Sequence, residues 1–195
     1  VCDGDPLDWR NTHADLIGVW ERLAPLVLDV SSYLDQAMKA GRRILFEGAQ
    51  GTMLDIDHGT YPFVTSSNTT AGAAGTGVGI GPTVIDSVVG VVKAYTTRVG
   101  NGPLPSGFDP EMDQHMRELG GEFGATTGRP RRCGWFDAVL ACYAARVNGL
   151  TGVAVTKLDV LDTIAEISIA VAYSTEDGGS TSEFPADTWS LESVQ

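Results

Sequence analysis

The sequence predicts an α/β fold in which a mainly parallel central sheet is flanked by helices. One observation is that short apolar runs rich in β-branched residues alternate along the chain with segments of helical periodicity. The other is composition: 43% of the 195 residues are hydrophobic and 19% are charged, which suffices for a core and argues against disorder. Ligands of such sheets bind beyond the carboxyl ends of the strands.

The first half of the chain predicts a helix, a strand and a long loop. Apolar residues three and four positions apart indicate a helix over 9–40, interrupted near Pro25 and closed by Gly41. The apolar run 44–46 predicts a buried strand. From there to about Pro82 the chain is rich in small polar residues, and loops of this length are usually functional.

The second half predicts alternating helices and strands. Pro110 suits the first turn of a helix, and Asn148-Gly149 suits the end of another. The predicted elements are a helix over 83–92, a strand over 93–99, helices over 110–119 and 135–147, and strands over 152–155 and 166–173.

Net charge and cysteine content argue against several classes of protein. The chain carries 13 basic and 25 acidic residues, a net charge of −12, which disfavours binding to nucleic acid. No apolar stretch reaches the roughly 20 residues of a membrane span. Three cysteines form no paired framework and lack metal-ligand spacing, so we expect a reducing cytoplasm. Three scattered histidines argue against a histidine-built metal site. The N-terminus has neither a basic start nor an apolar signal core, and its initial Val1 fits processing or excision from a longer chain.

Thr156-Lys157-Leu158-Asp159 follows the predicted strand over 152–155 and matches the T/N-K-x-D pattern of guanine recognition. An aspartate accepts two hydrogen bonds from guanine N1–H and the 2-amino group, a pair that adenine lacks. The lysine stem can lie along the purine face. A surface turn with a solvated Lys–Asp pair is the alternative.

The segment over 126–132, TTGRPRR, places two hydroxyls and three guanidiniums in seven residues of an acidic chain. Arginine binds carboxylates and phosphates through two parallel hydrogen bonds, and Gly128 permits close approach of a ligand to the backbone. The segment therefore predicts an anion site, with a solvated basic loop as the alternative.

The stretch over 48–70 is dense in small hydrogen-bond donors of the kind that surround phosphate or ribose. Asp55 and Asp57 lack the further ligands of an EF-hand loop. His58 is either a general base beside Asp57 or, more commonly for a lone histidine, a structural hydrogen-bonding residue. The glycines over 72–81 match neither a dinucleotide fingerprint nor a P-loop.

Four stretches in order, over 46–72, 93–103, 121–139 and 156–162, resemble the signatures of the adenylosuccinate synthetase family, and the resemblance covers about residues 15–188. It implies a P-loop-NTPase-like architecture, incomplete here. It also implies a GTP-dependent ligase of AMP and purine biosynthesis. In that family GTP phosphorylates the 6-oxygen of IMP, and the amino group of L-aspartate displaces the phosphate to give adenylosuccinate.

The resemblance also implies roles for residues of this chain. Gln50 corresponds to the glutamine facing the 6-oxygen of IMP, Thr65 to the threonine on its 5′-phosphate, and Val99 to the backbone contact with its ribose. The loop Ala125 to Arg131 corresponds to the aspartate-binding loop. Its members are Ala125, Thr126, Thr127, Gly128, Arg129, Pro130 and Arg131. By the same resemblance Arg129 also meets IMP, and Arg131 also meets the GTP side. Lys157, Leu158 and Asp159 correspond to the GTP-binding motif.

The family's P-loop, catalytic Asp and His, and Mg²⁺ ligands lie in an N-terminal portion without counterpart here, and a C-terminal portion is also absent after Gln195. We therefore expect residues 1–195 to be the central part of a single domain, inactive alone, with no metal ligands of its own. The resemblance also implies a homodimer. The alternative is a non-catalytic nucleotide-binding module; a general GTPase is disfavoured because no P-loop is present.

Overall fold

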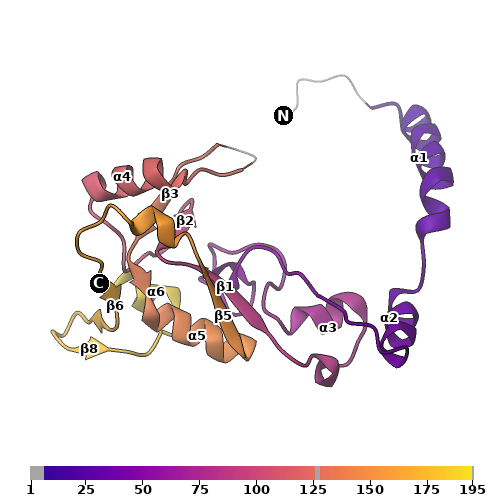
Figure 1. Ribbon diagram of the computed structural model, residues 1–195. Helices are drawn as coiled ribbons and strands as arrows, with labels where there is room; N and C mark the ends of the chain where they lie inside the picture. The colour runs from indigo at the N-terminus through magenta and orange to yellow at the C-terminus, as the bar shows by residue number, and fades with distance from the viewer. Residues whose placement is uncertain (1–6, 126–127, 195) are drawn as a thin grey trace. The chain divides into compact units, whose positions relative to one another are not determined.

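The computed structural model describes residues 7–125 and 128–194 (Figure 1). The chain divides into two compact units, Val1–Leu45 with Val78–Ile80, and Phe46–Gly77 with Gly81–Gln195. Each unit is described by itself below. The single-domain expectation stays a prediction.

The first unit consists mainly of two helices. Helix α1 (Trp9–Leu23) begins after Asp8, whose carboxylate accepts a hydrogen bond from the N–H of Arg10. A 3-10 turn over Ala24–Leu26 holds Pro25, and helix α2 (Val30–Lys39) follows. The predicted interruption is thus confirmed, and Gly41 with φ of 71° ends α2 as expected. Neither helix buries a residue.

Two parallel strand pairs belong to the second unit. Strand β1 (Val89–Lys93) pairs with β5 (Gly152–Thr156), Val89 lying opposite Gly152. Strand β4 (Phe136–Asp137) pairs with β6 (Ile169–Ala170) in the same sense. Because β1 and β5 are 63 residues apart in sequence, the pairing requires a crossover through most of the unit.

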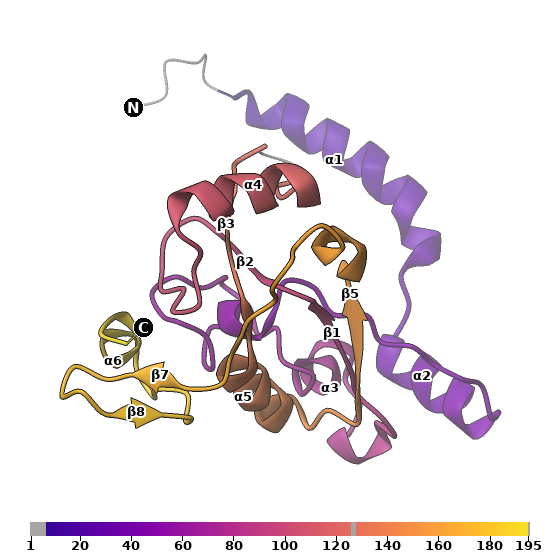
Figure 2. The ribbon, with the colours of Figure 1, turned by 60° about the vertical axis from the view of Figure 1, so that its left-hand side comes forward.

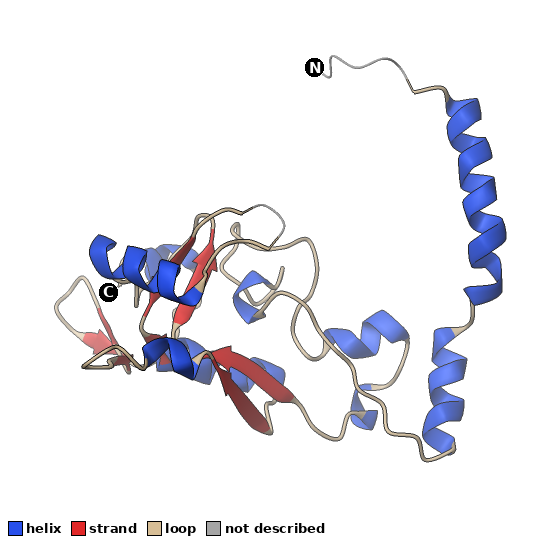
Figure 3. Cartoon of the chain, turned by 45° about the horizontal axis from the view of Figure 1, so that its top comes forward, coloured by secondary structure: helices blue, strands red, loops and turns tan. Residues whose placement is uncertain are grey.

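Two antiparallel pairs complete the strands described. Strand β2 (Thr96–Val99) pairs with β3 (Arg131–Gly134), which sets Val99 opposite Arg131. Strand β7 (Tyr173–Ser174) pairs with β8 (Ser180–Thr181). The chain from 48 to 72 contains no strand and only one short 3-10 turn, in agreement with the predicted loop (Figure 3).

Helices of the second unit are α3 (Ala73–Val78), which runs to the boundary between the units, α4 (Pro110–Gly120), α5 (Ala138–Asn148) and α6 (Thr188–Glu192). Asp109 caps α4 and Asp137 caps α5, and both helices end at a left-handed glycine. Asp137 is buried and accepts a hydrogen bond from Tyr173 Oη at 2.7 Å, so the cap of α5 also joins it to β7.

The second unit has two hydrophobic clusters. The larger lies where α4 packs beside β2 and β3, an arrangement visible in Figure 2. Its buried members are Ala94, Tyr95, Met116, Cys133, Val160 and Leu161. The smaller consists of Val139, Tyr173, Leu191 and Val194. The larger cluster supports the strand ends at which the sequence predicts the nucleotide motifs.

Several sequence predictions about local structure were wrong. Residues 44–46 form no strand, and Leu45 is 90% exposed, because no described strand pairs with them. The segment 83–92 is not a helix: a 3-10 turn over Pro82–Val84 leads into β1, whose β-branched residues pair with β5. The strand expected over 93–99 is divided between β1 and β2 by Ala94 and Tyr95.

Two other elements have different bounds in the structure than the sequence predicted. Helix α5 begins at Ala138 because Asp137 acts as its N-cap, so Trp135 lies outside the helix. The strand expected over 166–173 is reduced to β6 and the start of β7, with unpaired residues between them. Among the described residues, no helix is long and apolar enough to cross a membrane.

Candidate functional site

Asp55 organises the loop region between Phe46 and Thr70. Its side chain is fully buried, and its carboxylate receives hydrogen bonds from two separate stretches of the loop. The backbone donors, at 2.5–3.1 Å, are Asp57, His58, Thr69 and Thr70. Burial by itself would raise the pKa of Asp55, but these N–H groups outweigh it and lower the pKa to about 2. The ionised carboxylate therefore ties the two stretches together.

The loop held by Asp55 presents Gln50 and Thr65, two of the residues predicted to contact IMP. The N–H of Thr65 donates to the carbonyl of Leu54 at 2.8 Å, immediately before Asp55. Thr69 Oγ1 donates to the carbonyl of Gly51 at 2.7 Å, next to Gln50. The Gln50 side chain is exposed and Thr65 is half-buried. Both thus lie on backbone that the same carboxylate network fixes.

Gln50 and Lys157 share a rare backbone conformation. Each has φ of 61°, and across residues 7–125 and 128–194 they are the two non-glycine residues with positive φ. The left-handed region costs a residue with a Cβ about 1–2 kcal/mol. Such strain persists where the surrounding structure imposes it, and it concentrates at functional sites. Both residues are ones for which the sequence predicts a nucleotide contact.

Arg98 connects the loop region to β2. Its Nη2 donates to Thr60 Oγ1 at 2.7 Å and to the carbonyl of Phe63 at 3.0 Å. Burial, and then the charge of Arg132, lower the pKa of Arg98 to about 10, so it remains a cation at neutral pH. Because Val99 follows Arg98 directly, this contact places the predicted ribose position near the loop that carries Thr65.

The predicted aspartate-binding loop is the tip of a hairpin. Phe123 bridges Pro130, and the N–H of Gly124 donates to the carbonyl of Arg129 at 2.8 Å. Gly128, with φ of 63°, donates its N–H to the carbonyl of Gly124. The described residues of the loop are exposed from Ala125 onward up to Pro130, and Thr126 and Thr127 lie outside the described residues.

The predicted guanine motif begins at the carboxyl end of β5. Lys157 follows the strand and donates Nζ to the carbonyl of Gly120 at 2.6 Å, which ties the motif to the end of α4. Leu158 and Asp159 are exposed in the 3-10 turn over Leu158–Leu161. The strand-end location predicted from the sequence is thus confirmed, and the carboxylate of Asp159 is accessible to a ligand.

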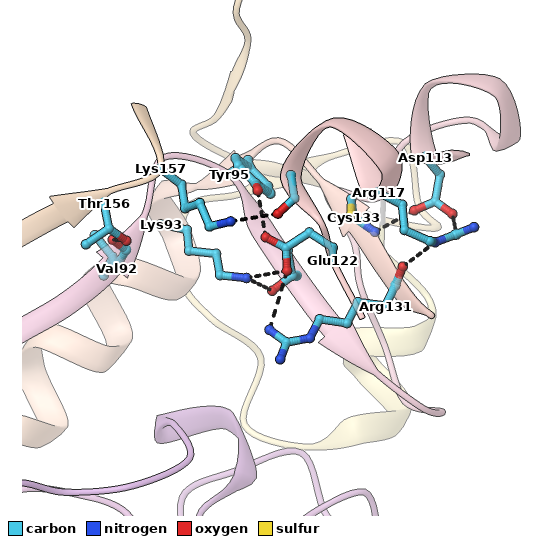
Figure 4. A network of polar contacts seen from close by, with 12 residues as sticks. Val92, Lys93, Tyr95, Asp113, Arg117, Glu122, Arg131, Cys133, Thr156 and Lys157 are labelled. Atoms are coloured by element: carbon cyan, nitrogen blue, oxygen red, sulfur yellow. Dashed lines mark hydrogen bonds and ion pairs between the residues drawn. The ribbon is translucent and has the colours of Figure 1, made fainter. Parts of the chain in front are cut away.

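A buried glutamate joins these segments. Glu122 is 2% exposed and follows the left-handed Gly121 that ends α4. It accepts hydrogen bonds from Lys93 Nζ and Tyr95 Oη, each at 2.6 Å, and from Arg131 Nη1 at 3.4 Å (Figure 4). The structure therefore brings Lys93, Tyr95 and Arg131 together on one carboxylate.

The loop also holds the aspartate and histidine considered as an acid–base pair. Asp57 accepts a hydrogen bond from Asn68 Nδ2 at 2.6 Å, and His58 is exposed. The N–H of His58 donates to Asp55 Oδ1, and the carbonyl of His58 accepts a hydrogen bond from Tyr143 Oη. These contacts favour the structural interpretation of the pair. In the part of the chain that the structure describes, no group of three or more His, Cys, Asp or Glu residues could hold a metal ion.

Comparison with known proteins decides the family. The family model for adenylosuccinate synthetase matches residues 2–195, nearly the whole chain. The chain belongs to the adenylosuccinate synthetase family. The fold class predicted from the sequence is confirmed, since an adenylosuccinate synthetase structure from Plasmodium falciparum superposes with a TM-score of 0.92 at 37% identity. The chain therefore contains part of the family's P-loop-like α/β nucleotide-binding fold.

Similar synthetases are longer than this chain. The relative from Synechocystis is 56% identical over 187 residues, which cover 96% of this chain and 42% of the relative. The relative from Myxococcus xanthus is 54% identical over 195 residues, covering 98% and 44%. The Plasmodium match covers 97% of this chain and 46% of that one. The chain thus spans under half the length of these members of the synthetase family.

Sequence reasoning missed the residues that support the site. It weighed Asp55 only as a metal ligand and gave Arg98 and Glu122 no role. A charged residue directly after the Gly120-Gly121 helix end, followed by Phe123, was the available signal for Glu122. The ligand contacts of Gln50, Thr65 and the other residues assigned by resemblance stay predictions.

Proposed function

We propose that the full-length protein containing this chain is an adenylosuccinate synthetase. It transfers the γ-phosphoryl group of GTP to the 6-oxygen of IMP, and the amino group of L-aspartate then displaces phosphate to form adenylosuccinate. The observation that supports this most is the left-handed backbone at Gln50 and Lys157. Strain at the residues predicted to meet IMP and the guanine base is expected of a preorganised ligand site.

The predicted roles follow from the chemistry of each side chain. Gln50 contacts the 6-oxygen, Thr65 the 5′-phosphate, and the backbone at Val99 the ribose. Arg129 and Arg131 bind the carboxylates of aspartate, Arg129 also meeting IMP and Arg131 the GTP side. Positive charge beside the transferred phosphoryl group would also stabilise the charge that develops there.

Guanine specificity comes from the motif after β5. Lys157 lies against the purine with its stem, and Leu158 continues the pocket. The exposed carboxylate of Asp159 accepts from N1–H and the 2-amino group of guanine.

The chain is the central part of a single domain in this proposal. The β1–β5 pair supports it: the register sets Val89 and Val91 on one face and Val153 and Val155 on the other, and all are exposed. Parallel sheets are almost always covered on both faces. Further chain of the kind that the longer relatives have would cover them. The 195 residues alone would then lack turnover.

Other parts of the proposal rest on the family resemblance. The protein acts in the cytoplasm as a homodimer, without nucleic-acid or membrane partners. Mg²⁺ would neutralise phosphate charge in the complete enzyme. The family resemblance implies that its ligands lie outside this segment.

The decisive experiment measures adenylosuccinate formation by the full-length protein with GTP and with ATP. We expect product with GTP, and none from the 195-residue chain alone. Asp159→Asn raises the KM for GTP roughly tenfold or more by loss of the charged acceptor, and leaves the KM for IMP unchanged. Asp162→Asn, a change at an exposed carboxylate three residues away, serves as the matched control. Equal losses for GTP and IMP would exclude the guanine assignment.

A further inference from the structure

Glu122 occupies the position from which one side chain can hold the base of the predicted aspartate-binding loop. Its carbonyl accepts the N–H of Arg131 at 3.0 Å, and its carboxylate accepts Arg131 Nη1. Its own N–H donates to the carbonyl of Arg117, inside α4. Main chain and side chain of Glu122 thus both fix Arg131, where the hairpin leaves the protein body.

The carboxylate of Glu122 is ionised and fully engaged. Burial alone would raise its pKa, but hydrogen bonds from Lys93 and Tyr95, and the charges of Lys93 and Lys157, lower the pKa below its ordinary value. Conversely, burial and then the hydrogen bond to Glu122 raise the pKa of Tyr95, which stays neutral. The glutamate is therefore an anion that two cations share, and one of them is Arg131.

Glu122 holds one nitrogen of the Arg131 guanidinium and leaves another without a partner in the described part of the chain. Its Nη1 faces Glu122, whereas its Nε is buried and has no hydrogen-bond acceptor among the described residues. A buried unpaired donor of a guanidinium costs free energy unless an acceptor arrives. A carboxylate can supply two acceptor oxygens to such a planar fork. The guanidinium is thus held by Glu122 at Nη1, while its buried Nε has no acceptor among the described residues.

The same carboxylate links this arginine to the guanine motif. Lys157 donates to the carbonyl of Gly120, two residues before Glu122, and Lys93 at the end of β1 lies opposite Thr156 in the β1–β5 register. Figure 4 shows Lys93 and Arg131 pointing at the carboxylate of Glu122, with Lys157 directed at a backbone carbonyl nearby.

We infer that Glu122 is a positioning residue that orients the guanidinium of Arg131 for the carboxylate of substrate aspartate. The inference rests on the proposed function. Glu122 itself touches no substrate. It acts by holding Arg131 through Oε2, and Lys93, the second cation on that oxygen, keeps it ionised.

The test compares Glu122→Gln with two controls in the full-length protein. Glu122→Gln removes the charge shared by Lys93 and Arg131, and it raises the KM for aspartate about tenfold while the KM for IMP changes less than about twofold. Glu118→Gln makes the same chemical change at an exposed position of α4 and leaves both values unchanged. Tyr95→Phe lowers the melting temperature but leaves the KM for aspartate unchanged, since Tyr95 bonds Oε1 and Arg131 bonds Oε2.

A rise of equal size in the KM for IMP and aspartate, or a Tyr95→Phe variant that matches Glu122→Gln, would overturn the inference in favour of general loosening. Should Glu122→Gln fail to fold, Glu122→Asp, which keeps the charge and withdraws it by one methylene, must show the same selective rise.

A second readout needs no turnover: the rate at which phenylglyoxal modifies Arg131, followed by peptide mass. Glu122→Gln raises that rate about threefold, which is roughly 0.6 kcal/mol of lost restraint. An unchanged rate would contradict the inference. If the unsubstituted protein makes no adenylosuccinate, the proposed function fails, and this rate still tests how Arg131 is held.

Discussion

Asp55 and Glu122 are both buried carboxylates with lowered pKa, yet they are held by different kinds of partner. The backbone donors to Asp55 are neutral N–H groups within 15 residues of it in sequence. The side-chain partners of Glu122 include two cations, and Lys93 is 29 residues away. Asp55 shapes one loop, whereas Glu122 joins β1, α4 and β3. Neutral backbone donors thus build the predicted IMP side, and charged side chains build the predicted aspartate side.

Asp55→Ala is the variant for which we expect the largest loss of stability. It leaves buried backbone donors without an acceptor, so we expect a loss of about 3 kcal/mol or more in the free energy of unfolding. Asp57→Ala, at an exposed carboxylate in the same turn, costs less than about 1 kcal/mol. Urea denaturation of the full-length protein measures both. A similar small loss for the two variants would show that the loop does not depend on Asp55.

Acid titration distinguishes the contribution of Asp55 from that of Glu122. The folded pKa of Asp55 is about 2 against an ordinary value of 3.8, so its stabilisation is complete above pH 4 and disappears as the pH falls toward 2. About 1–2 kcal/mol of unfolding free energy is lost in that interval, after allowance for solvent near the loop surface. Glu122→Gln retains this loss, and Asp55→Asn abolishes it. A Glu122→Gln variant without the acid transition would assign the effect to the wrong carboxylate.

Glycine substitution at the two left-handed residues gives the smallest effects. Gln50→Gly relieves backbone strain at an exposed side chain, so unfolding free energy rises by about 0.5–1 kcal/mol while adenylosuccinate formation falls. Lys157→Gly gains the same relief but loses the bond to the Gly120 carbonyl, and its stability does not rise. Thermal unfolding paired with the activity assay checks both. An active, stabilised Gln50→Gly variant would remove Gln50 from the predicted site.

The sequence by itself determined helices α1, α2 and α4 and the family. Asp8, Asp29 and Asp109 cap helices by bonds to backbone only two or three residues away, so their sequence patterns suffice to place helix starts. The four synthetase-like stretches likewise identified the nucleotide motifs, since each is contiguous in sequence.

Only the tertiary structure decided which apolar runs become strands and which charges meet. The sequence predicts a strand at 44–46 and a helix through 89–92, but the second run has β5 as partner and the first has none among the described residues. Likewise nothing near Glu122 in sequence indicates Lys93 or Tyr95. Strand pairing and buried ion pairs depend on segments far apart along the chain, and their free energy arises only when folding brings those segments together.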